Sequence, residues 1–103
     1  MTNHLKIQLI LGSTREGRQG EKVGKWIYNL ASKRKDFTTE FIDLKDWKIP
    51  FIHDPNPPGS GKYSDPLIIK WAQKIKETDA YIIVTPEYNH GYPAVLKNSF
   101  DVI

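Results

Sequence analysis

The sequence predicts an α/β protein in which helices cover both faces of a parallel sheet. Segments with the apolar pattern of strands alternate with amphipathic segments of helical period, in the order β-α-β-α-β-α. Right-handed connections between such units align successive strands in parallel and put the helices on the faces of the sheet. A length of 103 residues corresponds to one domain at most.

The first strand and the first helix have the most regular patterns. Apolar residues recur at every second position from Leu5 to Leu11, and Gly12 ends this strand. A polar loop, residues 13–20, follows. The next segment then carries apolar residues at i, i+3, i+4, i+7 and i+8, namely Val23, Trp26, Ile27, Leu30 and Ala31. We expect this stripe, Trp26 included, to face the core.

The middle of the chain holds a second strand, a long loop and a second helix. Phe37 to Leu44 is rich in β-forming residues. Residues 48–64 contain four prolines and two glycines and predict a long loop. Asp65 is a helix N-cap followed by proline at the first helical position, and Trp71 lies on the apolar stripe of the helix that begins there.

The third strand is the most uniformly apolar of the three. It runs from Ala80 to Thr85, a polar loop over residues 86–92 follows, and Pro93 opens a third helix. Such a strand suits the centre of a sheet, yet it is the last strand of this chain. We therefore expect the sequence to be the N-terminal part of a longer domain, or a partner chain to cover the open edge.

Composition excludes several classes of protein. The chain contains no cysteine, which excludes a disulfide scaffold, a thiolate metal site and a cysteine nucleophile. Its apolar runs are far shorter than the about 18 residues of a membrane span, and no signal peptide precedes the first strand. We therefore expect a cytoplasmic protein with no membrane partner. A net charge of +3 and scattered aromatic residues do not indicate a nucleic-acid surface.

The first loop is a candidate site for an anion. Residues 1–35 hold eight of the basic and two of the acidic residues, so positive charge is concentrated around this loop. The loop supplies backbone N–H groups, hydroxyls and guanidinium groups from Gly12, Ser13, Thr14, Arg15, Gly17, Arg18 and Gly20. It lacks a G-x-G-x-x-G motif, and Arg18-Gln19 stand where a P-loop requires Lys and Ser/Thr. A surface turn with solvated arginines is the alternative.

The second loop, residues 85–93, leaves the carboxyl end of the third strand. In doubly wound sheets, ligands bind at that end, where the strand order reverses about the first strand. Tyr88, Asn89, Gly91 and Tyr92 suit a flat heterocycle held partly by the backbone. A proline-bounded turn packed on the next helix is equally compatible. The three histidines lie in separate regions without the spacing of a metal site or a hydrolytic dyad.

Together, the two loops resemble the signatures of the NAD(P)H-dependent FMN reductases. These are flavodoxin-like proteins related to quinone, azo-dye and chromate reductases. The first signature is Gly-Ser-Thr-Arg-Glu-Gly-Arg at 12–18 with Gly-Glu-Lys-Val at 20–23, and the second is Thr-Pro-Glu-Tyr-Asn-His-Gly at 85–91 with Leu-Lys-Asn at 96–98. The resemblance extends from Lys6 to Ile103, but it covers only the front of the family domain.

The resemblance implies a flavodoxin-like three-layer α/β/α fold, with residues 1–103 as the N-terminal portion of a single FMN-binding domain. It also implies a site for FMN. Many relatives carry a serine and an asparagine where this chain has Arg18 and Gly20. The residues implied to bind FMN are Ser13, Arg15, Gly17, Arg18, Gln19 and Gly20 around the phosphate, and Pro86, Glu87, Tyr88, Asn89 and Gly91 along the ring.

The resemblance further implies a function. Hydride from NAD(P)H would pass through bound FMN to a small-molecule acceptor such as free flavin, a quinone, an azo compound or a metal oxyanion, with no catalytic side chain. Family members usually form homodimers or homotetramers. A non-catalytic flavodoxin-like binding or assembly module is the alternative, because the rest of the family domain is not in this sequence.

Overall fold

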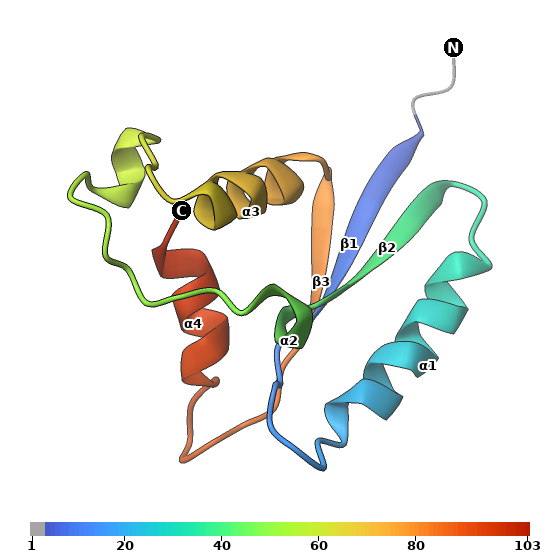
Figure 1. Ribbon diagram of the computed structural model, residues 1–103. Helices are drawn as coiled ribbons and strands as arrows, with labels where there is room; N and C mark the ends of the chain where they lie inside the picture. Colours follow the sequence, from blue (N-terminus) through green and yellow to red (C-terminus); the bar gives the residue numbers. More distant parts are fainter. Residues whose placement is uncertain (1–3) are drawn as a thin grey trace.

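The computed structural model describes residues 4–103, and its sheet has the predicted parallel arrangement. The strands β1 (Leu5–Leu11), β2 (Phe37–Asp43) and β3 (Ala80–Val84) lie in the order β2-β1-β3, with β1 in the middle (Figure 1). Leu5 of β1 is opposite Phe37 of β2, and Ile7 of β1 is opposite Ala80 of β3. The prediction of a parallel sheet is confirmed.

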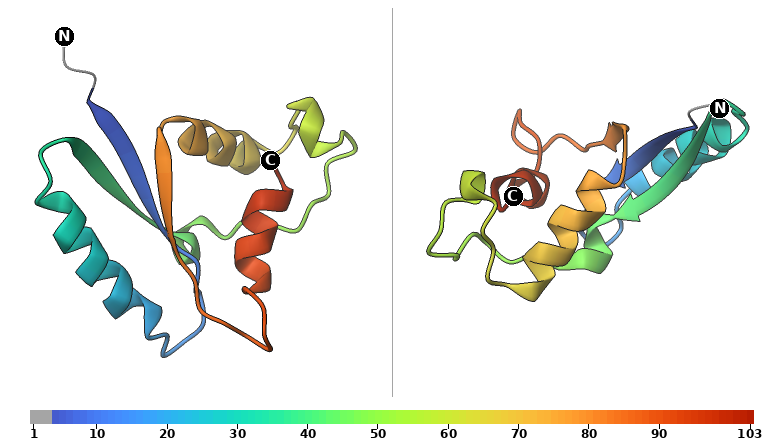
Figure 2. Two further views of the ribbon diagram at one scale, coloured as in Figure 1. Left: turned by 180° about the vertical axis from the view of Figure 1, so that it is seen from behind. Right: turned by 90° about the horizontal axis from the view of Figure 1, so that it is seen from above.

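Helices cover both faces of this sheet, as predicted. The helix α1 (Gly20–Ser32) lies on one face, while α3 (Pro66–Lys76) and α4 (Ala94–Asp101) lie on the other (Figure 2). Two short elements were not predicted, the one-turn helix α2 (Leu44–Trp47) and the 3₁₀ turn η1 (Pro58–Ser60). The result is a three-layer α/β/α arrangement.

The alternation of side chains along β1 divides the core into two parts. Leu9 and Leu11 point to the α1 face, where they pack with Val84 of β3. Ile10 points to the other face and packs with Trp71 of α3 and Leu96 of α4. Because successive residues of a strand face opposite sides, a strand of consecutive apolar residues serves both layers at once.

Trp71 is the centre of the core beneath α3 and α4. Its side chain is 0% exposed, and its indole N–H donates a hydrogen bond of 2.8 Å to the carbonyl oxygen of Ser99. Trp47 of α2 packs against it at a ring-centroid distance of 4.9 Å. The expected core position of Trp71 is confirmed. Its indole N–H is buried, and the Ser99 carbonyl is the acceptor that it needs there.

Val23 and Leu30 of the expected apolar stripe are 47% and 49% exposed, so the stripe does not face the core as a whole. The expectation that Trp26 is a core residue is also wrong. Its side chain is 63% exposed, and α1 instead turns Gly24, Ile27, Tyr28 and Ala31 toward the sheet. Gly24 explains this rotation, because a Cβ there would lie 3.3 Å from Cε2 of Phe41. Because Gly24 has no side chain, α1 can approach the sheet closely at this point. The buried face of α1 therefore differs from the one that the pattern of apolar residues predicts.

The element boundaries follow the capping residues closely. Asp65 accepts a hydrogen bond from the N–H of Leu67 and caps α3, as predicted. The second strand ends at Asp43 rather than at Leu44, because the Asp43 carboxylate accepts from the N–H of Lys45 and caps α2. Pro93 stands before α4 as its N-cap.

The outer edge of β3 has no neighbouring strand within the described part of the chain. Its side chains Tyr81 and Ile83 are 46% and 41% exposed, although the strand is apolar throughout. The sequence-based expectation of an open edge next to this strand is confirmed. No helix of residues 4–103 combines the length and the apolar character that crossing a membrane requires.

Replacing Trp71 by alanine is predicted to destabilise the fold far more than replacing Trp26. Trp71→Ala removes a fully buried ring and leaves the Ser99 carbonyl without its donor, so we expect a loss of about 3–5 kcal/mol in the free energy of unfolding. Trp26→Ala is the matched control and should cost less than about 1 kcal/mol. Urea unfolding followed by circular dichroism measures both values, and equal losses would contradict the assignment of the core.

Candidate functional site

The two candidate loops meet at the carboxyl edge of the sheet. β1 and β3 are parallel neighbours, so the loops that follow them leave the sheet side by side, at the point where the strand order reverses. Between them lies a cavity of about 360 Å³. Its lining joins both loops to the start of α1: Ser13, Arg15, Arg18, Gln19, Gly20, Val23, Val84, Thr85, Pro86, Glu87 and Tyr88.

Ser13 supplies an unused hydrogen-bonding group to this cavity. The residue is 1% exposed, and its hydroxyl has no partner. The helix α1 begins at Gly20, directly beside it, and Gln19 caps the helix with no side-chain hydrogen bond. The first amides of a helix and a buried free hydroxyl are donors that need an acceptor. An anionic ligand at this position satisfies both.

Gly20 makes room for the Ser13 hydroxyl. A Cβ on Gly20 would lie 2.9 Å from Oγ of Ser13, closer than side-chain atoms normally approach. Gly17 has a φ of 70°, in the left-handed region that glycine adopts without strain. These two glycines therefore shape the first loop so that its backbone turns tightly around the cavity.

The two arginines of the first loop differ in their contacts. Arg15 is exposed, and its guanidinium donates only to the carbonyl oxygen of the neighbouring Glu16, at 2.9 Å. Arg18 is held inside: its guanidinium donates to both carboxylate oxygens of Asp43, at 2.8 and 2.5 Å, and to the Ser13 carbonyl at 2.6 Å. Arg15 is thus free to bind a ligand, whereas Arg18 is already paired.

The pair of Arg18 and Asp43 changes the titration of both groups. The hydrogen bond to Asp43 raises the pKa of Arg18 above its ordinary value. Burial by itself raises the pKa of Asp43, but the hydrogen bonds from Arg18 and from the N–H of Lys45, together with their charges, outweigh it and lower that pKa below its usual range. Both groups therefore stay charged at neutral pH.

Asp43 was not among the residues that the sequence singled out. It ends β2, 25 positions from Arg18 in the sequence, and becomes its partner because β1 and β2 are adjacent. The sequence does contain a signal for this pair, namely an acidic residue at the carboxyl end of the second strand. This signal points to Arg18 only once the second strand is known to lie beside the first.

The second loop contributes its first four residues, Thr85 to Tyr88, to the cavity and then forms a tight turn. Tyr88 and Gly91 exchange two backbone hydrogen bonds, of 2.9 and 3.2 Å, around Asn89 and His90, which both have positive φ. The His90 N–H donates to the Glu87 carboxylate at 3.0 Å. Asn89 and Gly91 lie at the exposed end of this turn, outside the cavity lining, so the structure does not bring them together with the first loop.

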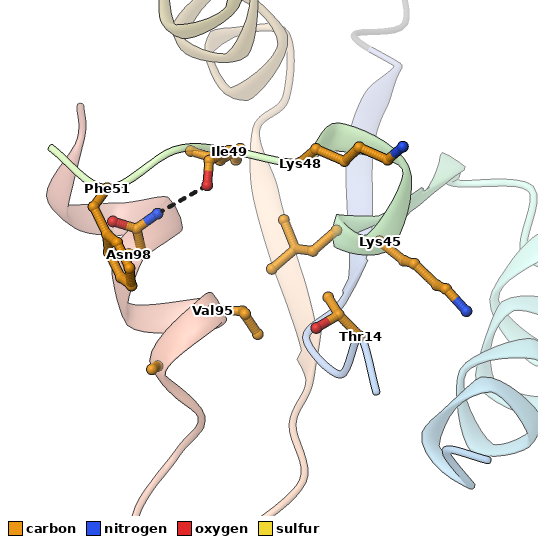
Figure 3. Close-up of a pocket in the computed structure, with 9 residues that line it drawn as sticks. Thr14, Lys45, Lys48, Ile49, Phe51, Val95 and Asn98 are labelled. Carbon is orange, nitrogen blue, oxygen red and sulfur yellow. Dashed lines mark hydrogen bonds between the residues drawn. The ribbon is translucent and has the colours of Figure 1, made fainter. Parts of the chain in front are cut away.

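A second cavity, of about 260 Å³, lies on the other side of the first loop, between Thr14, α2 and α4 (Figure 3). Its walls are mostly apolar, and the amide of Asn98 donates to the Ile49 carbonyl across one end. The ammonium groups of Lys45 and Lys48 point away from it in Figure 3. It has none of the free buried donors of the first cavity, so the candidate anion site is the cavity at Ser13.

No group of three or more His, Asp or Glu side chains lies close enough to hold a metal ion among residues 4–103. The fold defines a doubly wound α/β protein whose candidate anion-binding loop lies at the switch point of a parallel sheet. The model of the NADPH-dependent FMN reductase family matches residues 5–103, and the chain belongs to this family. This family assignment agrees with the resemblance found in the two loops.

Individual relatives support the same assignment. An NAD(P)H-dependent FMN reductase of Schizosaccharomyces pombe is 36% identical over 93% of this chain and 49% of its own length. A 2-hydroxy-1,4-benzoquinone reductase of a Burkholderia species is 31% identical over 94% of this chain and 49% of its own length. The flavoenzyme NAD(P)H:(acceptor) oxidoreductase FerB of Paracoccus denitrificans superposes with a TM-score of 0.72 at 26% identity, covering 95% of this chain and 50% of FerB. The chain thus spans about half the length of these relatives.

We predict that Gly20→Ala destabilises the first loop through Ser13. The added Cβ collides with the Ser13 hydroxyl, so we expect a loss of about 1–3 kcal/mol in the free energy of unfolding. The loss should shrink in the double variant Ser13→Ala/Gly20→Ala, which lacks the colliding oxygen. Gly59→Ala, where no atom lies within 4 Å, is the control for the substitution itself. An equal loss with and without the hydroxyl would contradict this geometry.

A pH dependence follows from the lowered pKa of Asp43. A carboxyl whose pKa is lower in the folded state stabilises the fold above its unfolded pKa of about 4, and this contribution disappears as the pH falls through the folded value. Asp43→Asn lacks it, so the difference in unfolding free energy between the original chain and the variant should narrow below about pH 4. Urea unfolding at several pH values measures this difference, and a constant gap would contradict the prediction.

Proposed function

We propose that this protein is an FMN-dependent oxidoreductase, which passes hydride from NAD(P)H through bound FMN to a small-molecule acceptor. The single observation that carries the proposal is the cavity in which both loops meet around a buried hydroxyl without a partner. Membership of the FMN reductase family adds the chemistry to this geometry. The relatives' names suggest free flavins and quinones as acceptors, and azo compounds and metal oxyanions belong to the same proposal.

The residues of the cavity fit the two ends of FMN. The Ser13 hydroxyl, the uncapped start of α1 at Gly20 and the exposed guanidinium of Arg15 suit a phosphate, because all three can donate to an anion. Gly17 and Gln19 supply backbone to the same end. Pro86, Glu87 and Tyr88 form the opposite wall and would lie along the ring. We also assign Asn89 and Gly91 to the ring, although they lie outside the cavity lining.

When bound, FMN supplies hydride acceptance and release, and the protein supplies binding and orientation. The chain's own residues would then fix the phosphate, align the ring with the wall formed by the second loop, and leave one side open to NAD(P)H and the acceptor. Nothing in this scheme requires a side chain to donate or accept a proton.

We further propose that residues 1–103 are the N-terminal portion of a single flavodoxin-like domain, in a cytoplasmic protein that forms homodimers or homotetramers. Two observations support the assignment to the N-terminal portion of a domain. Apolar side chains along β3 are exposed, and the relatives are about twice as long as this chain. The radius of gyration, 14.8 Å, also exceeds the about 13 Å of a complete domain of this size. Tyr81 and Ile83 project from the face covered by α3 and α4, so further strands at the β3 edge would cover them together with the helices that follow those strands.

Flavin retention is the direct test. The purified chain is incubated with FMN, free flavin is removed, and the visible absorption spectrum is recorded. Retained flavin absorption that NADPH or NADH bleaches would support the oxidoreductase. A chain that folds but retains no flavin and does not react with NAD(P)H would contradict the proposal and favour a non-catalytic binding or assembly module of the same fold.

Arg15→Ala is predicted to weaken FMN binding by about tenfold or more, because the variant loses a charged donor to the phosphate. The loss should be much smaller for riboflavin, which lacks the phosphate. Arg34→Ala, an exposed arginine beyond the far end of α1, is the matched control and should leave both affinities unchanged. Flavin fluorescence titration measures all of them, and an equal loss for FMN and riboflavin would rule out Arg15 as a phosphate contact.

A further inference from the structure

We propose that Arg18 is a positioning residue: clamped by Asp43, it sets the shape of the first loop through Ser13 and does not itself contact the phosphate. This inference rests on the proposed function, since it concerns the same FMN site. It also differs from what the charge of Arg18 suggests, which is a direct phosphate ligand.

The contacts of Arg18 leave its guanidinium little freedom. Nη1 donates to Asp43 and to the Ser13 carbonyl, so both of its hydrogens are used, and Nη2 donates to the other carboxylate oxygen of Asp43. The side chains of Arg18 and Asp43 are only 8% and 16% exposed. A turn toward a phosphate would leave the Asp43 carboxylate largely buried and unpaired, which is strongly unfavourable.

The clamp connects three segments of the site. Asp43 ends β2 and also accepts from the N–H of Lys45 at the start of α2. Arg18 joins this point to the first loop by holding the carbonyl of Ser13. The same Ser13 keeps its hydroxyl buried and free. Because the carbonyl is fixed from one side, the residue's backbone has a defined orientation, and its hydroxyl is aimed before any ligand binds.

The clamp also has an electrostatic consequence for an anion in the cavity. Asp43 alone would place a negative charge beside a site that is to accept a phosphate, and Arg18 neutralises it at 2.5–2.8 Å. Removing Arg18 should therefore weaken phosphate binding, because the Asp43 charge is then uncompensated. Removing Asp43 should weaken it for a different reason, because Arg18 is then no longer held against the Ser13 carbonyl. If Arg18 instead bound the phosphate directly, Asp43→Asn should strengthen phosphate binding, because the loss of the carboxylate would free the guanidinium to bind.

The test compares FMN and riboflavin affinities, by fluorescence titration, of Asp43→Asn, Arg18→Met and the double variant. We expect each single variant to lose about tenfold or more in FMN affinity, a smaller loss for riboflavin, and no further loss in the double variant. Asp36→Asn is the matched control, since Arg34 and Asp36 form a similar two-bond pair away from the cavity. An FMN affinity that is unchanged or higher in Asp43→Asn overturns the inference.

A second measurement separates positioning from a general loss of structure. Ser13→Ala should lower FMN affinity in the original chain but change it less than about twofold in the Asp43→Asn background, because the hydroxyl is no longer aimed there. A Ser13→Ala effect of the same size in both backgrounds overturns the inference. If Asp43→Asn fails to fold, Arg18→Lys is used in its place. A residue at position 18 that bound the phosphate directly would keep most of the FMN affinity as lysine. A lysine cannot form the two hydrogen bonds to Asp43, so we expect a large loss of FMN affinity if Arg18 acts as the clamp.

The outcomes also separate this inference from the proposed function. If the original chain binds no FMN, the proposed function fails and the inference fails with it. If the original chain binds FMN and Asp43→Asn binds it equally well, only the inference fails. If Asp36→Asn loses as much affinity as Asp43→Asn, the effect is not specific to the clamp, and the inference also fails.

Discussion

The parallel hydrogen-bonded ladder around β1 holds the other elements of this protein in place. β1 is hydrogen-bonded to β2 on one side and to β3 on the other, and its residues Leu9, Ile10 and Leu11 are fully buried between two helical layers. Because all three strands run in the same direction, their carboxyl ends share one edge of the sheet. The first loop, the second loop and Asp43 therefore meet there, although they are far apart in the sequence.

At that edge, the polar groups divide into those that hold the site together and those that are left free. Arg18 and Asp43 satisfy each other and also bind the backbone of Ser13 and Lys45. The Ser13 hydroxyl and the first amides of α1 remain without side-chain partners. Unused donors beside a satisfied ion pair form a candidate site that is ordered in advance. Binding of an anion there would not include the free-energy cost of ordering these groups.

The apolar surface of the chain is covered unevenly. The layer of α3 and α4 encloses Trp71 completely, while Tyr81 and Ile83 at the free edge of β3 and Trp26 on α1 are exposed. A chain about half as long as its relatives would have fewer elements to cover these side chains. The cavity at Ser13 is lined by the first loop, the start of α1 and the second loop.

The three strands, the three longer helices, their order and the two loops of the site could be predicted from the sequence, because period, caps and glycines are local properties that act within a few residues. The short elements α2 and η1 could not. The sequence by itself also did not determine which face of α1 is buried, or that Arg18 is paired with Asp43 and Asn89 lies at the end of a turn. The rotation of α1 depends on the contact of Gly24 with Phe41, and the arginine's partner depends on the neighbouring strand. Local sequence patterns do not predict such features, because they arise from contacts between segments that the sheet brings together.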